Sequence, residues 1–223
     1  MDTRRITALV LIIFPILAIA GWLGFGFGVM GGTGPDNVQG WIAGLGENSA
    51  TVKILLPIIT LLFVLAVVGG LGTIKNSMDG GAGHYLAGIG FLLIILGSAG
   101  QLIETAFTLA LAEASNNAAA AAAAGAAEIA ATNATVATNM YASGQAVGAL
   151  TTAATMVGFI LFGIGILQQK NFSPILAGLM VVTGIYTLVF CLVDYEGQLI
   201  GIGFLGIVAS LVWLGIGLLS KKS

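Results

Sequence analysis

The sequence predicts an all-α integral membrane protein, a six-transmembrane-helix bundle with an external alanine-rich helical segment between the third and fourth spans. Three observations predict this class: the composition, six long apolar runs and the placement of the basic residues. Of the 223 residues, 58% are hydrophobic and 7% are charged, against roughly 25% charged in an ordinary soluble domain. With a mean hydropathy of +1.07, the chain has too few polar side chains to cover a water-soluble fold.

The apolar runs divide the chain, residues 1–223, into the spans of a single membrane domain. Each run is near or above the ~20 residues that a helix needs to cross ~30 Å of hydrocarbon. The runs lack the alternating pattern that is typical of transmembrane β-strands. The predicted spans are residues 6–30, 54–74, 85–111, 146–167, 175–193 and 199–219.

The first span could also be a cleavable signal peptide. The start "MDTRRITALVLIIFPILAIAGW" combines two arginines, a short apolar core and the triplet Ala18-Ile19-Ala20, as a cleavable signal peptide does. The apolar run continues through "GWLGFGFGVM", well past the usual length of a signal core, and this favours a retained span.

The basic residues predict the orientation, because Lys and Arg collect on the cytoplasmic side of a membrane. With the N-terminus inside, six of the seven basic residues fall inside and only Lys53 falls outside. We therefore expect a multi-pass protein of the cell (plasma) membrane with both termini cytoplasmic. The six inner residues are Arg4, Arg5, Lys75, Lys170, Lys221 and Lys222.

The segment at residues 112–145 is rich in alanine, the best helix former, which is too weakly apolar to drive insertion beside several Asn and Glu residues. It is predicted to be helical and external. It could be a separate helix across the outer face, or it could extend both neighbouring spans into a hairpin. A hairpin that turned near Asn133 would have ~15 residues per arm and project ~22 Å. Asn133-Ala134-Thr135 is also an N-glycosylation acceptor pattern.

Glycine predicts how the spans pack. The pairs "GQAVG" at 144–148 and "GQLIG" at 197–201 have the spacing that lets helices approach closely. Such pairs could join two copies of the chain, but packing within one bundle is favoured because six spans must contact one another in any case.

Glu104 is the unexpected residue of the third span. It lies about 10 Å beyond the middle of the span, toward the outer leaflet. Ser98, Gln101, Glu104 and Thr108 recur at three- and four-residue spacing with Thr105, hence on one helix face. That face is predicted to avoid lipid, because an ionised carboxylate at this depth is costly.

Two roles remain open for Glu104. No Lys, Arg or His lies within the predicted spans to neutralise it. Either it is protonated and hydrogen-bonded to another span, for example to Thr151, Thr152 or Thr155, or it borders water and binds a proton or cation. The first role is favoured because Glu104 is nearer the interface than the midplane.

A second group of carboxylates is predicted at the outer surface. Glu113, Asp194 and Glu196 could gather there with Glu104 and attract a hard cation such as calcium. Their positions lack the spacing of known calcium loops, so solvated loop charges are the favoured interpretation and no metal site is predicted.

Known catalytic and cofactor motifs are missing from the sequence. His84 has no second His at ligand spacing, and Cys191 is the only cysteine. No nucleophile elbow, zinc-protease helix or phosphate-binding loop is present. With a net charge of −2 and no large basic cluster, the chain is not expected to bind nucleic acid. We therefore expect no enzyme activity and no cofactor.

Two stretches carry a family resemblance. The opening "RRITALVLIIFPILAIAG" and the block "GQAVGALTTAATMVGFILFGIGILQQKNFSPILAGLMVVTGI" resemble the prokaryotic six-span proteins grouped as domain of unknown function 4386. The resemblance covers about half the chain, and the alanine-rich segment departs from it. It implies a six-span topology and a prokaryotic host, and it adds no site residues.

The function expected from these observations is structural. The small-residue faces and the missing catalytic motifs predict an accessory component of a homo-oligomer or a larger membrane complex, in which the external segment is a contact surface. The alternative is a small proton- or cation-linked transporter or channel that uses Glu104.

Overall fold

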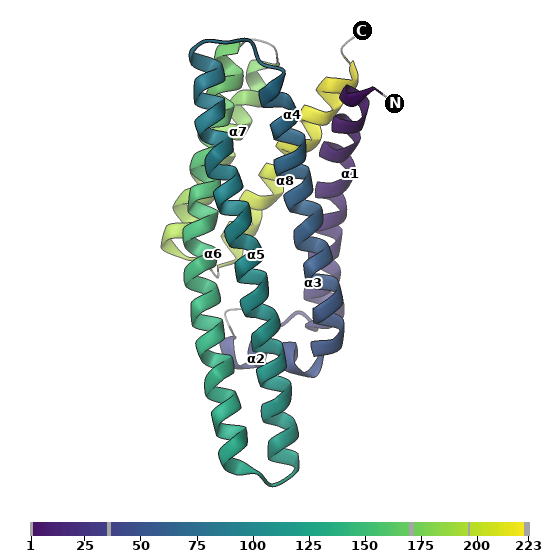
Figure 1. Ribbon diagram of the computed structural model, residues 1–223, viewed down its shortest axis with the longest axis vertical. Helices are drawn as coiled ribbons and strands as arrows, with labels where there is room; N and C mark the ends of the chain where they lie inside the picture. The colour runs from purple at the N-terminus through teal and green to yellow at the C-terminus, as the bar shows by residue number, and fades with distance from the viewer. Residues whose placement is uncertain (1, 35–36, 170–171, 196, 221–223) are drawn as a thin grey trace.

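The computed structural model describes residues 2–34, 37–169, 172–195 and 197–220, and the predicted basic positions Lys170, Lys221 and Lys222 lie outside them. All regular structure in the described residues is helical, with no strand (Figure 1). The helices are α1 (Thr3–Gly24), α2 (Val38–Glu47), α3 (Ser49–Val64), α4 (Leu71–Asn76), α5 (Ala82–Ala123), α6 (Ala127–Gln169), α7 (Pro174–Val193) and α8 (Gln198–Ser220). Two π-helical segments, η1 (Phe25–Val29) and η2 (Leu65–Gly70), continue α1 and α3.

Six helical stretches within the described residues are long and apolar enough to cross a membrane, which confirms the all-α class and the number of apolar helices. They contain 27, 28, 42, 43, 20 and 22 residues in chain order. The first combines α1 with η1, and the second runs from α3 through η2 into α4.

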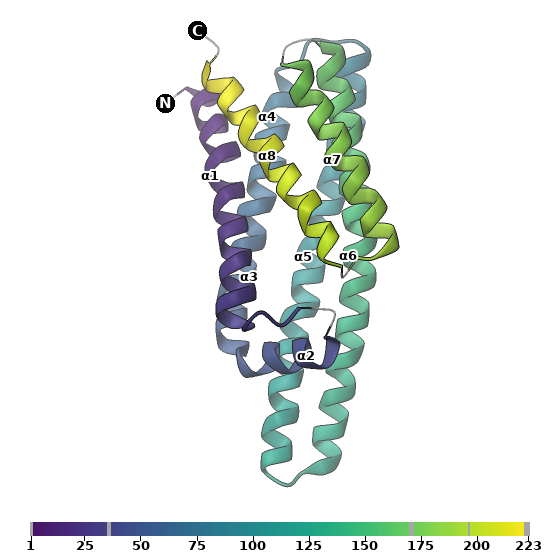
Figure 2. The same cartoon turned by 180° about the vertical axis from the view of Figure 1, so that it is seen from behind.

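Local sequence explains several helix ends. The Asp2 side chain accepts a hydrogen bond from the backbone N–H of Arg4 and caps α1, and Asn37 caps α2 in the same way through Gly40. Pro174 begins α7, where its missing N–H costs nothing. Arg4 also donates from Nε to the Leu218 carbonyl oxygen at 2.6 Å, so the ends of α1 and α8 lie together. Figures 1 and 2 show both termini at the same end of the bundle.

The alanine-rich segment forms the far ends of α5 and α6, which pair as a hairpin that extends past α2 (Figures 1 and 2). It therefore has the hairpin form and is not a separate helix. The turn lies at Gly125 and not near Asn133. Gly125 has φ +75°, a conformation that glycine adopts without steric cost, and the helices on either side of the turn end at Ala123 and begin again at Ala127.

Glycines at seven-residue intervals bring α5 and α6 into backbone contact. Gly83 and Gly90 of α5 lie opposite Gly165 and Gly158 of α6. A Cβ atom on Gly90 would lie 2.6 Å from the Gly158 carbonyl oxygen, and one on Gly158 would lie 2.6 Å from the Gly90 oxygen. Helices that touch this closely gain dispersion contacts along their whole length. We call this contact the glycine seam.

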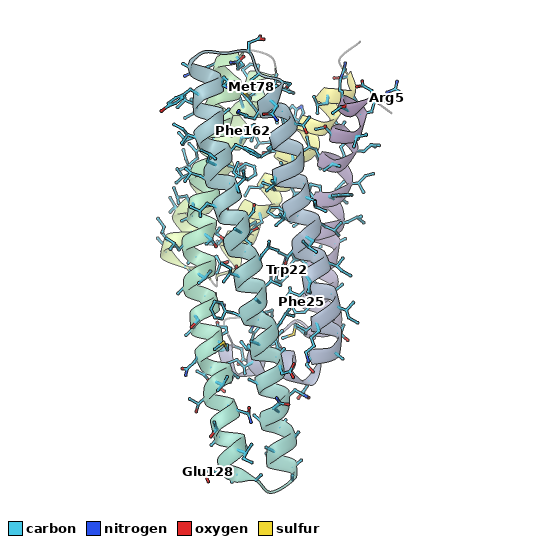
Figure 3. All side chains as sticks on the ribbon, in the orientation of Figure 1. Arg5, Trp22, Phe25, Met78, Glu128 and Phe162 are labelled. Carbon is cyan, nitrogen blue, oxygen red and sulfur yellow. The ribbon has the colours of Figure 1, made fainter. Side chains whose placement is uncertain are left out.

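Two apolar clusters complete the packing. One surrounds Phe159 and Phe162 of α6 and joins it to α1, α5, α7 and α8. The other surrounds Phe25 and Leu45 and joins the end of α1 to α2, α3, α5 and α6. Figure 3 labels Phe162 near the end of the bundle that holds the termini, and Phe25 between that end and the hairpin tip. The glycine pair at 144–148 also packs inside the bundle, since both residues face α5 side chains.

Candidate functional site

Glu104 continues the glycine seam by one more interval. Residues 83, 90 and 97 of α5 are glycines, and residue 104 follows at the same spacing. Its side chain therefore faces α6, where Gly148 makes room for it. A Cβ atom on Gly148 would lie 2.6 Å from Glu104 Cδ and 2.6 Å from the Tyr195 hydroxyl oxygen. Glycine at 148 is what allows the carboxyl group to sit between the two helices.

Tyr195 is the hydrogen-bond partner of Glu104. It lies in the turn between α7 and α8, which Figure 2 shows beside α6. Its hydroxyl donates to Glu104 Oε1 at 3.1 Å and to Oε2 at 3.2 Å. The contact joins residues that are 91 positions apart in the chain and holds the α7–α8 turn against α5 and α6.

Tyr195 acts as a neutral donor. Burial of the phenol and the nearby charge of Glu104 hold the pKa of Tyr195 well above its usual value, although the hydroxyl of Thr152 acts in the opposite direction. The phenol therefore keeps its proton at neutral pH, and its O–H group can donate a hydrogen bond to the carboxyl group.

Thr152 of α6 differs from the other threonines of that helix. Thr132, Thr135, Thr138, Thr151 and Thr155 each donate to the carbonyl oxygen four residues earlier. Thr152 is 1% exposed, and its hydroxyl forms no hydrogen bond of ordinary geometry with the described residues, although the Tyr195 hydroxyl lies near it. A buried hydroxyl without a partner is costly, so it needs an explanation from its surroundings.

Cys191 lies at the site on the side of α7. Its thiol donates to the Ala149 carbonyl oxygen at 2.9 Å, one residue after Gly148 on α6. We define the Glu104 site as the side chains of Glu104, Thr152, Cys191 and Tyr195 around Gly148. It is built from α5, α6, α7 and the α7–α8 turn.

A small cavity borders the site on the side of the hairpin. Its volume is about 20 Å³, which is enough for about one water molecule. Glu104 forms part of its wall. The other lining residues are Trp41, Thr108, Leu111, Met140, Tyr141, Gly144 and Gln145.

The predicted polar face of α5 is divided between two neighbours. Glu104 faces α6, whereas Thr105 shares a 2.9 Å hydrogen bond with Thr60 of α3. Thr108 donates to the backbone oxygen of Glu104 at 3.1 Å. Ser98 is buried and Gln101 is half-buried. The face avoids exposure as a whole, but its members do not form one site.

The sequence predicts Thr151, Thr152 or Thr155 of α6 as hydrogen-bond partners of Glu104, and the structure gives Tyr195 instead. Thr151 and Thr155 donate to their own helix. The signal that could have indicated Tyr195 is its place in "VDYEGQ", where a short turn leaves an aromatic residue with a polar tip beside the neighbouring helices.

The carboxylates that the sequence predicts at the outer surface have separate surroundings. Glu113 forms an ion pair with Lys53 of α3. Asp194 is exposed at the end of α7, and Glu196 lies outside the described residues. In the part of the chain that the structure describes, no group of three His, Cys, Asp or Glu side chains could hold a metal ion.

Asn133, the glycosylation candidate, lies within α6. Its side-chain nitrogen donates to the Ile129 carbonyl oxygen at 3.0 Å. Together with Lys53 and Glu113 it lines a shallow groove of about 570 Å³ at the base of the hairpin.

No family model, no curated protein and no solved structure matches this chain. The resemblance to domain of unknown function 4386 stays a prediction from the residues quoted for it.

Proposed function

We propose that this chain is an integral protein of the cell membrane that acts as a non-catalytic structural or accessory component of a homo-oligomer or larger membrane complex. The observation that carries the proposal is the α5–α6 hairpin, which Figures 1 and 2 show extending past α2, with none of the other described helices beside its tip. We propose that this hairpin is the surface through which the chain contacts its partner.

Exposed apolar side chains support the membrane location. Leu92 of α5, Ile175 of α7 and Leu192 of α7 are 66%, 68% and 69% exposed, and water would disfavour apolar surface of this extent. Among the described residues of α5, the large exposed apolar side chains run from Tyr85 to Ile103. That length corresponds to about 27 Å of helix, close to the ~30 Å of a hydrocarbon core. Glu104 follows at the end of this belt.

The composition of the hairpin supports its role as a contact surface. Alanine side chains bury little apolar area between two helices, so the tip gains little stability from packing, which supplies most of the stability of helices in proteins. Ile129, near the tip, is 59% exposed. A second copy of the hairpin or a partner protein would cover this surface and stabilise it.

Shortening the hairpin is expected to abolish the assembly and leave the bundle folded. Removing residues 117–123 and 127–133 takes one seven-residue interval from each arm, so the remaining side chains keep their faces. Wild-type protein in lipid nanodiscs is expected to have the mass of an assembly, and the shortened protein the mass of a single chain. Mass photometry measures both, and circular dichroism checks the helix content.

Gly125→Asn is the matched control, because asparagine tolerates the left-handed backbone of the turn and both arms keep their length. It should assemble like the wild type. A wild-type protein that is monomeric and binds no other membrane protein would contradict the proposed function, and so would a shortened protein that still assembles.

We further propose that both termini are cytoplasmic and that the hairpin tip faces outward. In a Cys191→Ala background, Ala124→Cys at the tip should react with an impermeant maleimide in intact cells. Asp79→Cys, beside Lys75 at the opposite end, should react only after the cells are permeabilised. Both positions are exposed, so accessibility of the side chain does not separate them. The reverse labelling pattern would overturn the orientation.

A further inference from the structure

When it is ionised, Glu104 carries a charge that the described basic residues nearest to it do not balance. Lys53, on the same side of the bundle, is paired with Glu113. Arg4 is bonded to the backbone of α8 near the termini. A carboxylate enclosed between packed helices without a cation is unfavourable. The Glu104 site therefore gains from a ligand that brings one positive charge.

The neighbouring hydroxyl groups suit a proton, the smallest ligand with one positive charge. Tyr195 donates to the carboxyl group in the structure. Thr152, near the same phenol, has a buried oxygen that forms no hydrogen bond of ordinary geometry in this arrangement. The phenol thus has two acceptors within its reach. It can donate to Glu104 when the carboxyl group is ionised, and it can turn to Thr152 when the carboxyl group holds a proton of its own.

The small cavity gives the carboxyl group contact with water. It has room for about one molecule. Thr108, Tyr141 and Gln145 offer polar groups in its wall. Its lining residues lie between Glu104 and the hairpin tip, so a proton would reach the site from that side.

We propose that Glu104 is a proton-binding site that exchanges with a single water molecule in this cavity. An O–H bond of a hydronium ion in the cavity breaks, an O–H bond forms on a carboxyl oxygen of Glu104, and a neutral water molecule remains. The charge of the carboxyl group changes from −1 to 0, and the Tyr195 hydroxyl moves its hydrogen bond to Thr152. This site is independent of the proposed structural role and does not require that protons cross the membrane.

The titratable groups that face Glu104 come from each element packed around it. They are Tyr141 on α6, Cys191 on α7 and Tyr195 in the α7–α8 turn. On the side of α2 the neighbour is Trp41, which does not titrate. On α3 the charged group is Lys53, which forms an ion pair with Glu113. Among the described residues that line the site, Glu104 supplies the carboxyl group.

Infrared difference spectroscopy of the protein in lipid nanodiscs tests the proposal. The wild type should show the carbonyl stretch of a protonated carboxylic acid, which appears as pH falls and shifts in D₂O. Glu104→Gln should lose this band, whereas Glu113→Gln, the matched control on the same helix, should keep it. Tyr195→Phe removes the donor to the ionised form and should raise proton affinity about tenfold, the equivalent of one hydrogen bond.

Several results would overturn the proposal. They are a band that persists in Glu104→Gln, a band that never titrates, and a band that does not shift in D₂O. Loss of the band on adding sodium chloride at constant pH would assign the site to a metal cation instead. If Glu104→Gln fails to fold, the titration of Tyr195→Phe, which retains the carboxyl group, still decides the outcome.

Discussion

Replacing Gly158 with leucine is expected to prevent assembly of the bundle, because the glycine seam has no space for a side chain. A Cβ atom at this position would lie 2.6 Å from the Gly90 carbonyl oxygen and 3.0 Å from the Ile94 backbone nitrogen. Both are backbone atoms of α5, so they cannot rotate away as a side chain would. The two longest helices would have to separate, and α6 also packs against α7 in the larger apolar cluster. We expect little folded protein after extraction in mild detergent, measured by size-exclusion chromatography and circular dichroism.

Replacing Gly158 with alanine is a milder form of this experiment, because it adds only one carbon atom. Gly158→Ala should lower the free energy of unfolding by about 1–3 kcal/mol, the usual cost of overfilling a packed core. Gly178→Ala on α7 is the control, because no atom lies within 4 Å of the position its Cβ would take. It should be neutral or slightly stabilising, since alanine favours helix over glycine. Equal effects of the two substitutions would show that α5 and α6 are not in backbone contact.

The sequence predicts the number of apolar helices because hydrophobic length is a property of each segment alone. It predicts their ends less well. Residue 111 ends the predicted third span because the apolar run stops there, yet α5 continues to Ala123. Hydrophobicity reports where the chain can enter lipid, whereas helix formation depends on backbone propensity, and alanine favours it equally well in water. The position of the turn could not be predicted either, because the segment is almost uniformly alanine and a single glycine does not interrupt a pattern of hydrophobicity.

The Glu104 site could be predicted only in part for a similar reason. A carboxyl group in an apolar run is visible in one segment, and its three- and four-residue spacing from Gln101 and Thr108 predicts that it lies on a face that avoids lipid. Its partner is not visible, because Tyr195 reaches it from a turn 91 residues away. Thr152 is one of three threonines of α6 that the sequence offers as partners for Glu104. The structure alone separates it from the other two, which donate hydrogen bonds to their own helix.

The stretch "GFGFG" at 24–28 contains Phe25, whose replacement is expected to cause the second large loss of stability. Phe25 and Phe27 have the same flanking glycines, so local sequence cannot separate them. In the π-helical segment η1, Phe25 is 0% exposed and Phe27 is 74% exposed. The Phe25 ring makes edge-to-face contacts with Trp22 at 5.6 Å and Trp41 at 6.0 Å between ring centroids. Figure 3 labels Trp22 and Phe25 close together. Phe25 therefore ties the end of α1 to α2, which carries Trp41.

Phe25→Ala is expected to lower the free energy of unfolding by about 3–5 kcal/mol, because it leaves a cavity in a filled core and removes two aromatic contacts. Phe27→Ala, two residues along the same segment, should change it by less than about 0.5 kcal/mol. Unfolding in mixed micelles with increasing dodecyl sulfate, followed by circular dichroism, measures both without relying on the nearby tryptophans. If the Phe25 substitution also exposes Trp41 to an aqueous quencher, then α2 depends on this ring for its position over the cavity beside Glu104. Equal losses from the two substitutions would instead mean that η1 does not fix which phenylalanine enters the core.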